Sequence, residues 1–303
     1  MTISTSSTSA STADGAGGLR ARLGRLAGVT VAVPDPDATA DFLSGGLAFA
    51  VEAGPDASWT VLCEGDYGER GQAAIVLERG DADGAQLREV TFEVGPAYDW
   101  DALRARLAAA NIAATEQPHG VAFADPGGVP LAVVAARDVA APAYDGLRPR
   151  RLGHVNLKAP DAPATAAFYA DVLGLRLSEQ IGEGLYFLRI ATEHHNVGLR
   201  GGERGELHHL GFELAGWNVY QPLLDRLSEA GYTVEYGPGR HRPGNNLFTY
   251  VVDPSSGLRV ELFADMAHIP DETSHVPRRW EAGDRMTKTI NRWGPTPPPS
   301  FLA

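Results

Sequence analysis

Two histidines and one glutamate in the second half of the chain combine the side chains of a metal site. The chain holds nine histidines, and eight of them follow residue 150. His154, His209 and Glu261 stand in three separate segments with the apolar pattern of β-strands. Two imidazoles and one carboxylate on one face of a metal ion leave three coordination positions open, as in non-haem Fe(II) oxygenases. Zinc hydrolases can use the same side chains, so these residues alone leave the reaction open.

These segments belong to an internal repeat that covers most of the chain. The matching pairs are LAGVTVAVPDPDATADFLSGGLAF from Leu26 with LGHVNLKAPDAPATAAFYADVLGL from Leu152, REVTFEV from Arg88 with HHLGFEL from His208, and DPGGVPLAV from Asp125 with DPSSGLRVEL from Asp253. In the last pair the second copy holds one extra residue. The repeat therefore predicts two modules with one fold.

The first copy of the repeat lacks the three candidate ligands. It has Gly28, Glu89 and Ala132 at the corresponding positions. A single strand histidine is more often structural than a ligand, but the absence of all three residues from the first copy favours a metal site in the second. His208 competes with His209 for the ligand role. Because neighbouring residues of a strand point to opposite faces, we expect only one of the two to reach the metal.

Each copy of the repeat predicts an α+β module. A strand leads through a Pro-Asp turn into a helix that a glycine ends, and further strands and a second helix follow. We expect two tandem modules of paired βαβββ units, each an open curved sheet or barrel. The predicted parts are a disordered tail (1–22), a metal-free module (23–137), a catalytic metal-binding module (150–266) and a C-terminal extension (267–303).

The composition of the chain excludes several classes of protein. The chain has 303 residues, a formal net charge of −12, and 44% hydrophobic residues. The acidic balance argues against nucleic-acid and anionic-membrane partners. No stretch of ~18 apolar residues predicts a membrane span, and no secretory signal pattern opens the sequence, so a cytoplasmic location is expected. The single cysteine, Cys63, excludes a disulfide within the chain and a cysteine metal cluster.

The second module resembles the type I extradiol ring-cleaving dioxygenases of the vicinal oxygen chelate superfamily. The stretches that carry the resemblance are LGHVNL with His154, EHHNVGL with His195, LHHLGFEL with His209, and RHRPGNNLFTYVVDPSSGLRVEL with His241, Tyr250 and Glu261. The resemblance is close over residues 150–265 and loose over 23–137, where this family keeps the fold without the metal. One departure is the extra residue before Gly257, which lengthens a turn.

The resemblance implies an oxidoreductase that opens the ring of a substituted catechol with O2 at an Fe(II) ion. The ion would be held by the two histidines and the glutamate, with Mn(II) as the alternative metal. It also implies a small aromatic diol as substrate, a role in the catabolism of aromatic hydrocarbons, and a homo-oligomer of four or more subunits. No nucleic acid or membrane partner is implied.

By the same resemblance, three further side chains act on the substrate. His195 would hydrogen-bond the bound oxygen species as acid or base, with His194 as the alternative. Tyr250 would hydrogen-bond the substrate oxygen, although a plain core tyrosine is its rival. His241 would contact the substrate hydroxyl region, although an exposed loop histidine is its rival. The side chains expected to bind substrate are Asn156, Phe187 and Phe248.

Two other functions remain open on the same scaffold. One is a metal-dependent isomerase or lyase of the superfamily, which would consume no O2. The other is a metal-free module that binds a small aromatic compound or an antibiotic. The C-terminal extension holds Trp280, Trp293, four arginines (Arg278, Arg279, Arg285 and Arg292) and several prolines, so we expect it to wrap a surface. It would cover the cavity mouth of the second module or a neighbouring subunit, where one arginine could meet an acidic substituent of the substrate.

Overall fold

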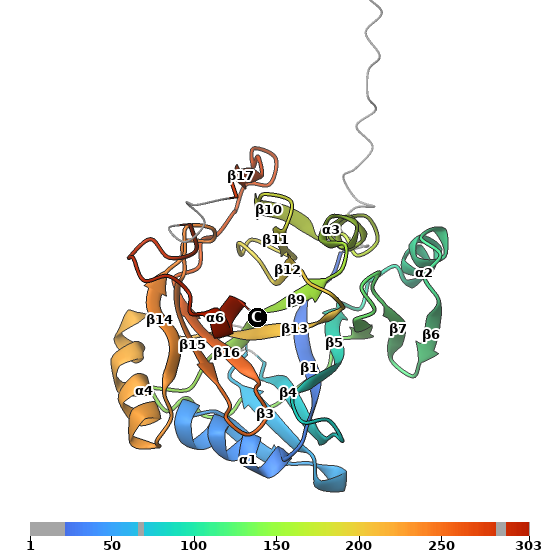
Figure 1. Ribbon diagram of the computed structural model, residues 1–303. Coiled ribbons are helices and arrows are strands. Elements are labelled where there is room, and N and C mark those ends of the chain that lie inside the picture. Colours follow the sequence, from blue (N-terminus) through green and yellow to red (C-terminus); the bar gives the residue numbers. More distant parts are fainter. Residues whose placement is uncertain (1–21, 66–69, 283–288, 303) are drawn as a thin grey trace, which may run out of the picture.

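The computed structural model describes residues 22–65, 70–282 and 289–302. Its strands form two mixed sheets, with helices at the periphery (Figure 1). Except for Arg22, the tail predicted to be disordered lies outside the described residues. Within the described parts of the chain, no helix combines the length and the apolar character needed to cross a membrane.

The first sheet has eight strands in the order β2-β3-β4-β1-β5-β8-β7-β6. Its strands are β1 (Arg25–Val33), β2 (Ala50–Ala53), β3 (Trp59–Cys63), β4 (Gln72–Arg79), β5 (Gln86–Val94), β6 (Ala114–Gln117), β7 (Gly120–Ala124) and β8 (Pro130–Ala135). The helices beside it are α1 (Pro36–Asp41), which continues as a π-helical turn over Phe42–Gly46, and α2 (Trp100–Ala109).

The second sheet has nine strands in the order β14-β15-β16-β13-β9-β12-β11-β10-β17. Its strands are β9 (Arg151–Ala159), β10 (Arg176–Ile181), β11 (Leu185–Arg189), β12 (Val197–Gly201), β13 (Glu206–Glu213), β14 (Val234–Arg240), β15 (Leu247–Val252), β16 (Arg259–Ala264) and β17 (Arg278–Trp280). The helices of this part are α3 (Ala162–Asp171), α4 (Trp217–Glu229) and α6 (Pro299–Leu302).

The strand pairing repeats from one sheet to the other. β1 pairs in parallel with β4 and antiparallel with β5, and β9 pairs in the same way with β12 and β13. β5 and β8 are parallel, as are β13 and β16. Each sheet thus joins two βαβββ units edge to edge, which confirms the predicted α+β fold. The module boundaries given above stay a prediction.

Local chemistry fixes where the helices begin. Asp35, Asp99 and Asp161 precede α1, α2 and α3, and each accepts hydrogen bonds from backbone N–H groups of the first turn. The apolar row of α4, at Val219, Leu223 and Leu227, is buried.

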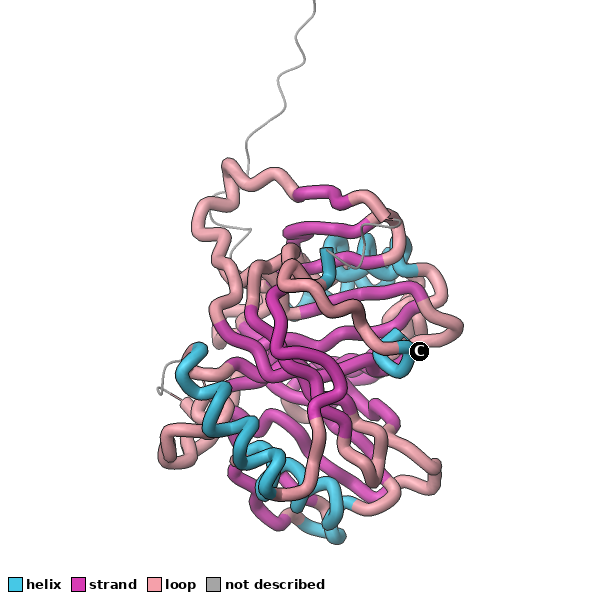
Figure 2. The backbone as a smooth tube through the Cα atoms, turned by 60° about the vertical axis from the view of Figure 1, so that its left-hand side comes forward, coloured by secondary structure: helices cyan, strands magenta, loops and turns pink. Residues whose placement is uncertain are grey.

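The C-terminal extension follows the second sheet as mostly irregular chain. β17 adds to the edge of the sheet, parallel to β10, and α6 is a short terminal helix. The remaining described part of the extension is drawn as loops in Figure 2, which agrees with an extended, wrapping path. Trp280 anchors it, because its Nε1 donates a hydrogen bond to Oε2 of Glu179 at 2.7 Å.

The two halves of the chain exchange corresponding hydrogen bonds through the turns DPGG and DPSSG. Thr39 of α1 donates from Oγ1 to Oδ2 of Asp253 at 2.7 Å. Tyr169 of α3 donates from its hydroxyl to Oδ2 of Asp125 at 3.3 Å. Both carboxylates are buried, and burial raises the pKa of Asp125. The first helix of each half therefore contacts the last turn of the other half.

The repeat offers a matched test of this exchange. Thr39→Val should lower the free energy of unfolding by about 1–2 kcal/mol, because it leaves the buried carboxylate of Asp253 one donor short. Thr165, at the same position of α3, has a buried Oγ1 without a hydrogen-bond partner among the described residues. Thr165→Val should therefore leave the free energy of unfolding unchanged or raise it, because the valine buries no unpaired hydroxyl. Urea unfolding measures both variants, and equal effects would contradict the assigned role of Thr39.

Candidate metal centre

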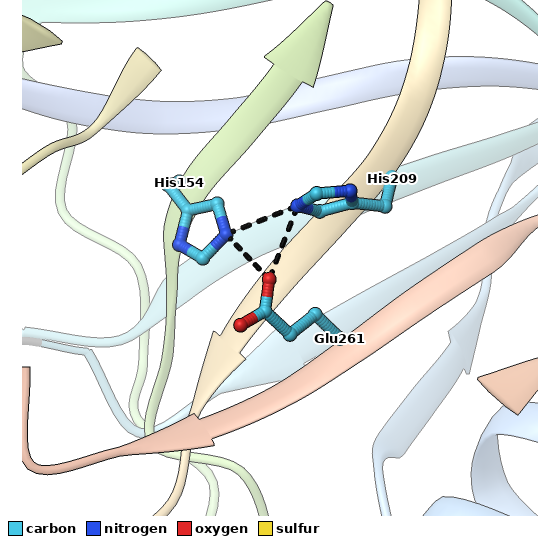
Figure 3. Close-up of side chains that lie close together, drawn as sticks. All are labelled: His154, His209 and Glu261. Carbon is cyan, nitrogen blue, oxygen red and sulfur yellow. Dashed lines mark hydrogen bonds and ion pairs between the residues drawn. The ribbon is translucent and has the colours of Figure 1, made fainter. Parts of the chain in front are cut away.

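The three candidate ligands meet at one buried point of the second sheet. His154 lies on β9, His209 on β13 and Glu261 on β16, and these are neighbouring strands. Figure 3 shows the three side chains pointing toward one another. Nε2 of His154 lies 3.3 Å from Nε2 of His209. Oε2 of Glu261 lies 3.0 Å from the first nitrogen and 3.1 Å from the second.

These separations fit a divalent cation. Adjacent positions of an octahedron with bonds of about 2.2 Å are about 3.1 Å apart. Burial lowers the pKa of His209 to about 4, so its imidazole is neutral near pH 7. Burial raises the pKa of Glu261, but the facing His154 and the hydrogen bonds from the histidines outweigh burial and hold it well below its usual range. A neutral imidazole and an ionised carboxylate are the forms that bind metals.

A glycine between the ligand strands makes room for this arrangement. Gly211 of β13 pairs with His154 on one side and with Glu261 on the other. A Cβ atom at Gly211 would lie 2.1 Å from Cε1 of His154. The absence of a side chain at Gly211 lets the imidazole of His154 lie over β13. Sequence reasoning missed Gly211, although its place two residues after His209 in the repeat was a usable signal.

The first sheet has the same register without the ligands. Thr91 of β5 pairs with Gly28 and with Ala132, as Gly211 pairs with its two neighbours in the second sheet. The threonine side chain fits because both neighbours are small. Glu89 stands two residues before Thr91. The register therefore confirms the repeat alignment, and the first sheet lacks the donor set of the second.

A β-bulge places both His208 and His209 on the wall of one cavity. The pairing of β13 with β9 runs from Leu207 directly to His209, which lies opposite Asn156, so His208 is an extra residue. Both imidazoles line the cavity, and their Nδ1 atoms lie 2.7 Å apart. The expectation that these neighbours face opposite sides of the sheet is wrong, because the bulge interrupts the alternation. His209, not His208, joins the group of three.

The cavity beside the three ligand atoms has a volume of about 360 Å³. Of the residues expected around the substrate, those that line it are Asn156, Phe187, His195, His241 and Tyr250. Phe248 is not among the lining residues. The ring of His241 covers it, with centroids 4.0 Å apart and the planes 15° from parallel. Phe248 thus supports His241 from below, and its expected place on the cavity wall is wrong.

His195 is the member of its histidine pair that reaches the cavity. It lies just before β12, in irregular chain, and its ring centroid is 4.5 Å from that of His154. His194 is buried behind it, with the two Nδ1 atoms 3.0 Å apart. Burial and the neighbouring histidines hold the pKa of His195 well below its usual value. Its imidazole is therefore neutral and can accept a proton.

Tyr250 and Asn246 hold the carboxylate of Glu261. The hydroxyl of Tyr250 donates to Oε2 at 2.9 Å, and Nδ2 of Asn246 donates to Oε1 at 3.1 Å. Nε2 of His241 lies 3.1 Å from the Tyr250 oxygen. Burial and the charge of Glu261 raise the pKa of Tyr250 well above its usual value, so it remains a donor. Asn246 was missed because a loop asparagine carries no sequence signal of its partner.

The C-terminal extension contributes part of the cavity wall. Its lining residues are Ala282, Ile290, Phe301 and Leu302, which confirms that it covers this cavity. Of the arginines named above, Arg285 lies outside the described residues, and the other three are absent from the cavity wall. Among the described residues, Arg200 of β12 is the arginine that lines the cavity, and the expectation of an arginine from the extension stays a prediction for Arg285.

The sequence around this site matches a known family model. Residues 151–262, which hold the three candidate ligands, match the model of the Glyoxalase/Bleomycin resistance protein/Dioxygenase superfamily. Within it, the resemblance to the type I extradiol dioxygenases is confirmed. The chain is 35% identical over 157 residues to metapyrocatechase 2 of Cupriavidus necator, which covers 51% of this chain and 47% of that protein. The chain thus spans about half the length of the curated relatives it matches.

Two solved structures share the fold over nearly the whole chain. A Mn(II)-bound glyoxalase from Novosphingobium aromaticivorans has a TM-score of 0.81 at 24% identity, and covers 92% of this chain and 94% of that chain. Homoprotocatechuate 2,3-dioxygenase from Arthrobacter globiformis has a TM-score of 0.81 at 21% identity, and covers 94% and 92%. At these identities the likeness establishes the fold.

The gap at Gly211 can be tested directly. Gly211→Ala places a methyl group against the His154 ring, so we expect the affinity for Mn(II) to fall about 10-fold or more. Gly184→Ala is the matched control, because Gly184 also lines the cavity and a Cβ there meets no atom within 4 Å. Metal content after dialysis against a chelator measures both. Equal metal content in the two variants would contradict the role given to Gly211.

Proposed function

We propose that this protein is an extradiol dioxygenase that opens the ring of a substituted catechol next to its hydroxyl groups with O2. Fe(II) is the proposed metal, with Mn(II) as the alternative, held by His154, His209 and Glu261. The observation that carries the proposal is the meeting of one ligand atom from each of these three side chains beside a cavity that His209, Glu261, His195 and Tyr250 line. The similarity to metapyrocatechase 2 supports the same reaction.

The metal ligands, His195 and Tyr250 have different roles in the proposed reaction. A bound divalent ion would supply a common contact for catechol and O2 and a path for electron density between them. Two neutral imidazoles and one carboxylate leave a net charge of about +1 at that point, which favours loss of a catechol proton. His195 lies at the cavity wall, in a position from which its imidazole would take up a substrate proton and return it later. Tyr250 keeps its hydroxyl hydrogen and would hydrogen-bond a substrate oxygen by turning this hydrogen away from Oε2 of Glu261.

The proposed function also includes a substrate class, a metabolic role, a cellular location and an oligomeric state. We propose a small aromatic diol as the substrate, a role in aromatic catabolism, a cytoplasmic location and a homo-oligomer of four or more subunits. The second candidate function is a metal-dependent isomerase or lyase, because a Mn(II)-bound glyoxalase shares the fold. A metal-free binding module is disfavoured, because it has no use for three converging ligand atoms.

Oxygen consumption separates these functions. The protein, loaded anaerobically with Fe(II) or with Mn(II), is mixed with a panel of catechols while dissolved O2 and visible absorbance are recorded. We expect O2 uptake with one equivalent per catechol and a yellow ring-opened product. Turnover of a substrate without O2 uptake would favour the isomerase, and binding of aromatic compounds without metal would favour the binding module.

Two variants should separate metal binding from turnover. His195→Phe should keep the metal and slow turnover by about 10²–10⁴-fold, the loss expected for an acid–base group. Glu261→Ala should lose the metal, because it removes the carboxylate of the site. His119→Phe, in the first half of the chain, is the control and should change neither quantity. Metal loss in His195→Phe would contradict this division of roles.

A further inference from the structure

His208 stands between a proposed metal ligand and the C-terminal helix α6. Its side chain is buried, with 4% of the residue exposed. Its Nδ1 atom lies 2.7 Å from Nδ1 of His209, and its Nε2 atom lies 2.9 Å from the backbone oxygen of Phe301. The bulge in β13 makes this possible, since it turns both imidazoles toward the same side.

Only one arrangement of protons fits both contacts when His209 offers Nε2 to a cation. Nδ1 of His209 then carries the hydrogen and donates to Nδ1 of His208. His208 in turn carries its hydrogen on Nε2 and donates to the carbonyl of Phe301. A metal-binding histidine is commonly fixed through its other nitrogen. His154 differs, because its Nδ1 is buried without a hydrogen-bond partner among the described residues.

Helix α6 is held at the same place by Arg259 of β16. Its guanidinium donates to the backbone oxygen of Ser300 at 3.0 Å and to that of His208 at 3.3 Å, and it pairs with Glu235 at 2.7 Å. The guanidinium also lies 5.6 Å from the ring centroid of Phe301. The helix is thus bound to the two strands that carry His209 and Glu261 (Figure 1).

Phe301 also closes the cavity from this side. Its ring centroid lies 4.6 Å from that of Tyr250 and 5.1 Å from that of His208, in edge-to-face contacts. With Leu302 it lines the cavity. The carbonyl that His208 contacts therefore belongs to the residue whose side chain forms part of the cavity wall.

We propose that His208 is a positioning residue that couples the docking of α6 to the metal site, an inference that rests on the proposed metal centre. By holding the tautomer and direction of His209, it raises the affinity for the metal. When α6 is docked, the hydrogen bond from His208 to the Phe301 carbonyl fixes His208 in place. His208 then orients His209 more firmly. Coupling between two equilibria is reciprocal, so metal binding must also stabilise the docked helix.

Two substitutions separate the two contacts of His208. His208→Asn keeps an acceptor, Oδ1, near the position of Nδ1 but has no group that reaches the Phe301 carbonyl. His208→Gln carries its amide near the position of Nε2 and leaves Nδ1 of His209 without its acceptor. Mn(II) is titrated into each full-length protein, and free Mn(II) is measured by electron paramagnetic resonance. We expect His208→Gln to weaken binding about 10–100-fold and His208→Asn to stay within about 3-fold of the unchanged protein.

His194→Asn is the matched control for these titrations. His194 is also buried and also contacts the next histidine through Nδ1, at 3.0 Å, but that neighbour is not one of the three ligands. It should leave Mn(II) affinity unchanged. Equal affinity of His208→Gln and the unchanged protein would overturn the positioning role, and so would an equal loss in His194→Asn.

The reciprocal effect needs no variant to be seen. Exchange of the backbone amide hydrogens of residues 300–302 is measured in the unchanged protein with and without Mn(II), and we expect slower exchange with the metal. His208→Asn should remove this difference, because its link to Phe301 is lost. If Mn(II) does not change the hydrogen-exchange rate of α6 in the unchanged protein, the proposed coupling is wrong. If the unchanged protein binds Mn(II) no better than Glu261→Ala does, the metal centre itself is wrong, which is a separate result.

Discussion

The structure depends on one demand: two imidazole nitrogens and a carboxylate oxygen must face one another in a buried place. Such a group is unfavourable in a protein interior unless charge or a cation balances it. Three adjacent strands supply the side chains, and Gly211 between them leaves the space that His154 occupies. Asn246 and Tyr250 then fix the carboxylate. The order of the strands, the glycine in β13 and the hydrogen bonds to the carboxylate together hold the three metal-site side chains in contact.

Much of the fold could be predicted from the repeat. Two copies of one pattern, each with a capped helix after its first strand, fixed the α+β class and the order of the elements. The three candidate ligands were also visible, because the other copy of the same fold has Gly28, Glu89 and Ala132 at their positions. The strand register bears out that comparison at Thr91 and Gly211.

Other features of the site have no signal in a single sequence. A β-bulge depends on how two strands pair, so the alternation rule gave the wrong direction for His208. The cover of Phe248 by His241 depends on where a loop folds. The partner of Asp253 lies more than two hundred residues away, in α1. Each of these results from contacts between segments that the sequence does not place beside each other.

The hydrogen bond from Thr39 to Asp253 links the first half of the chain to the strands that carry the metal-site residues. Asp253 directly follows β15, which carries Tyr250, and its turn leads into β16, which carries Glu261. The first half of the chain therefore holds the hairpin of β15 and β16, which carries the Glu261 carboxylate and its hydrogen-bond donor Tyr250. A copy of the repeat without the three ligands can thus still support the strands that hold them in the other copy.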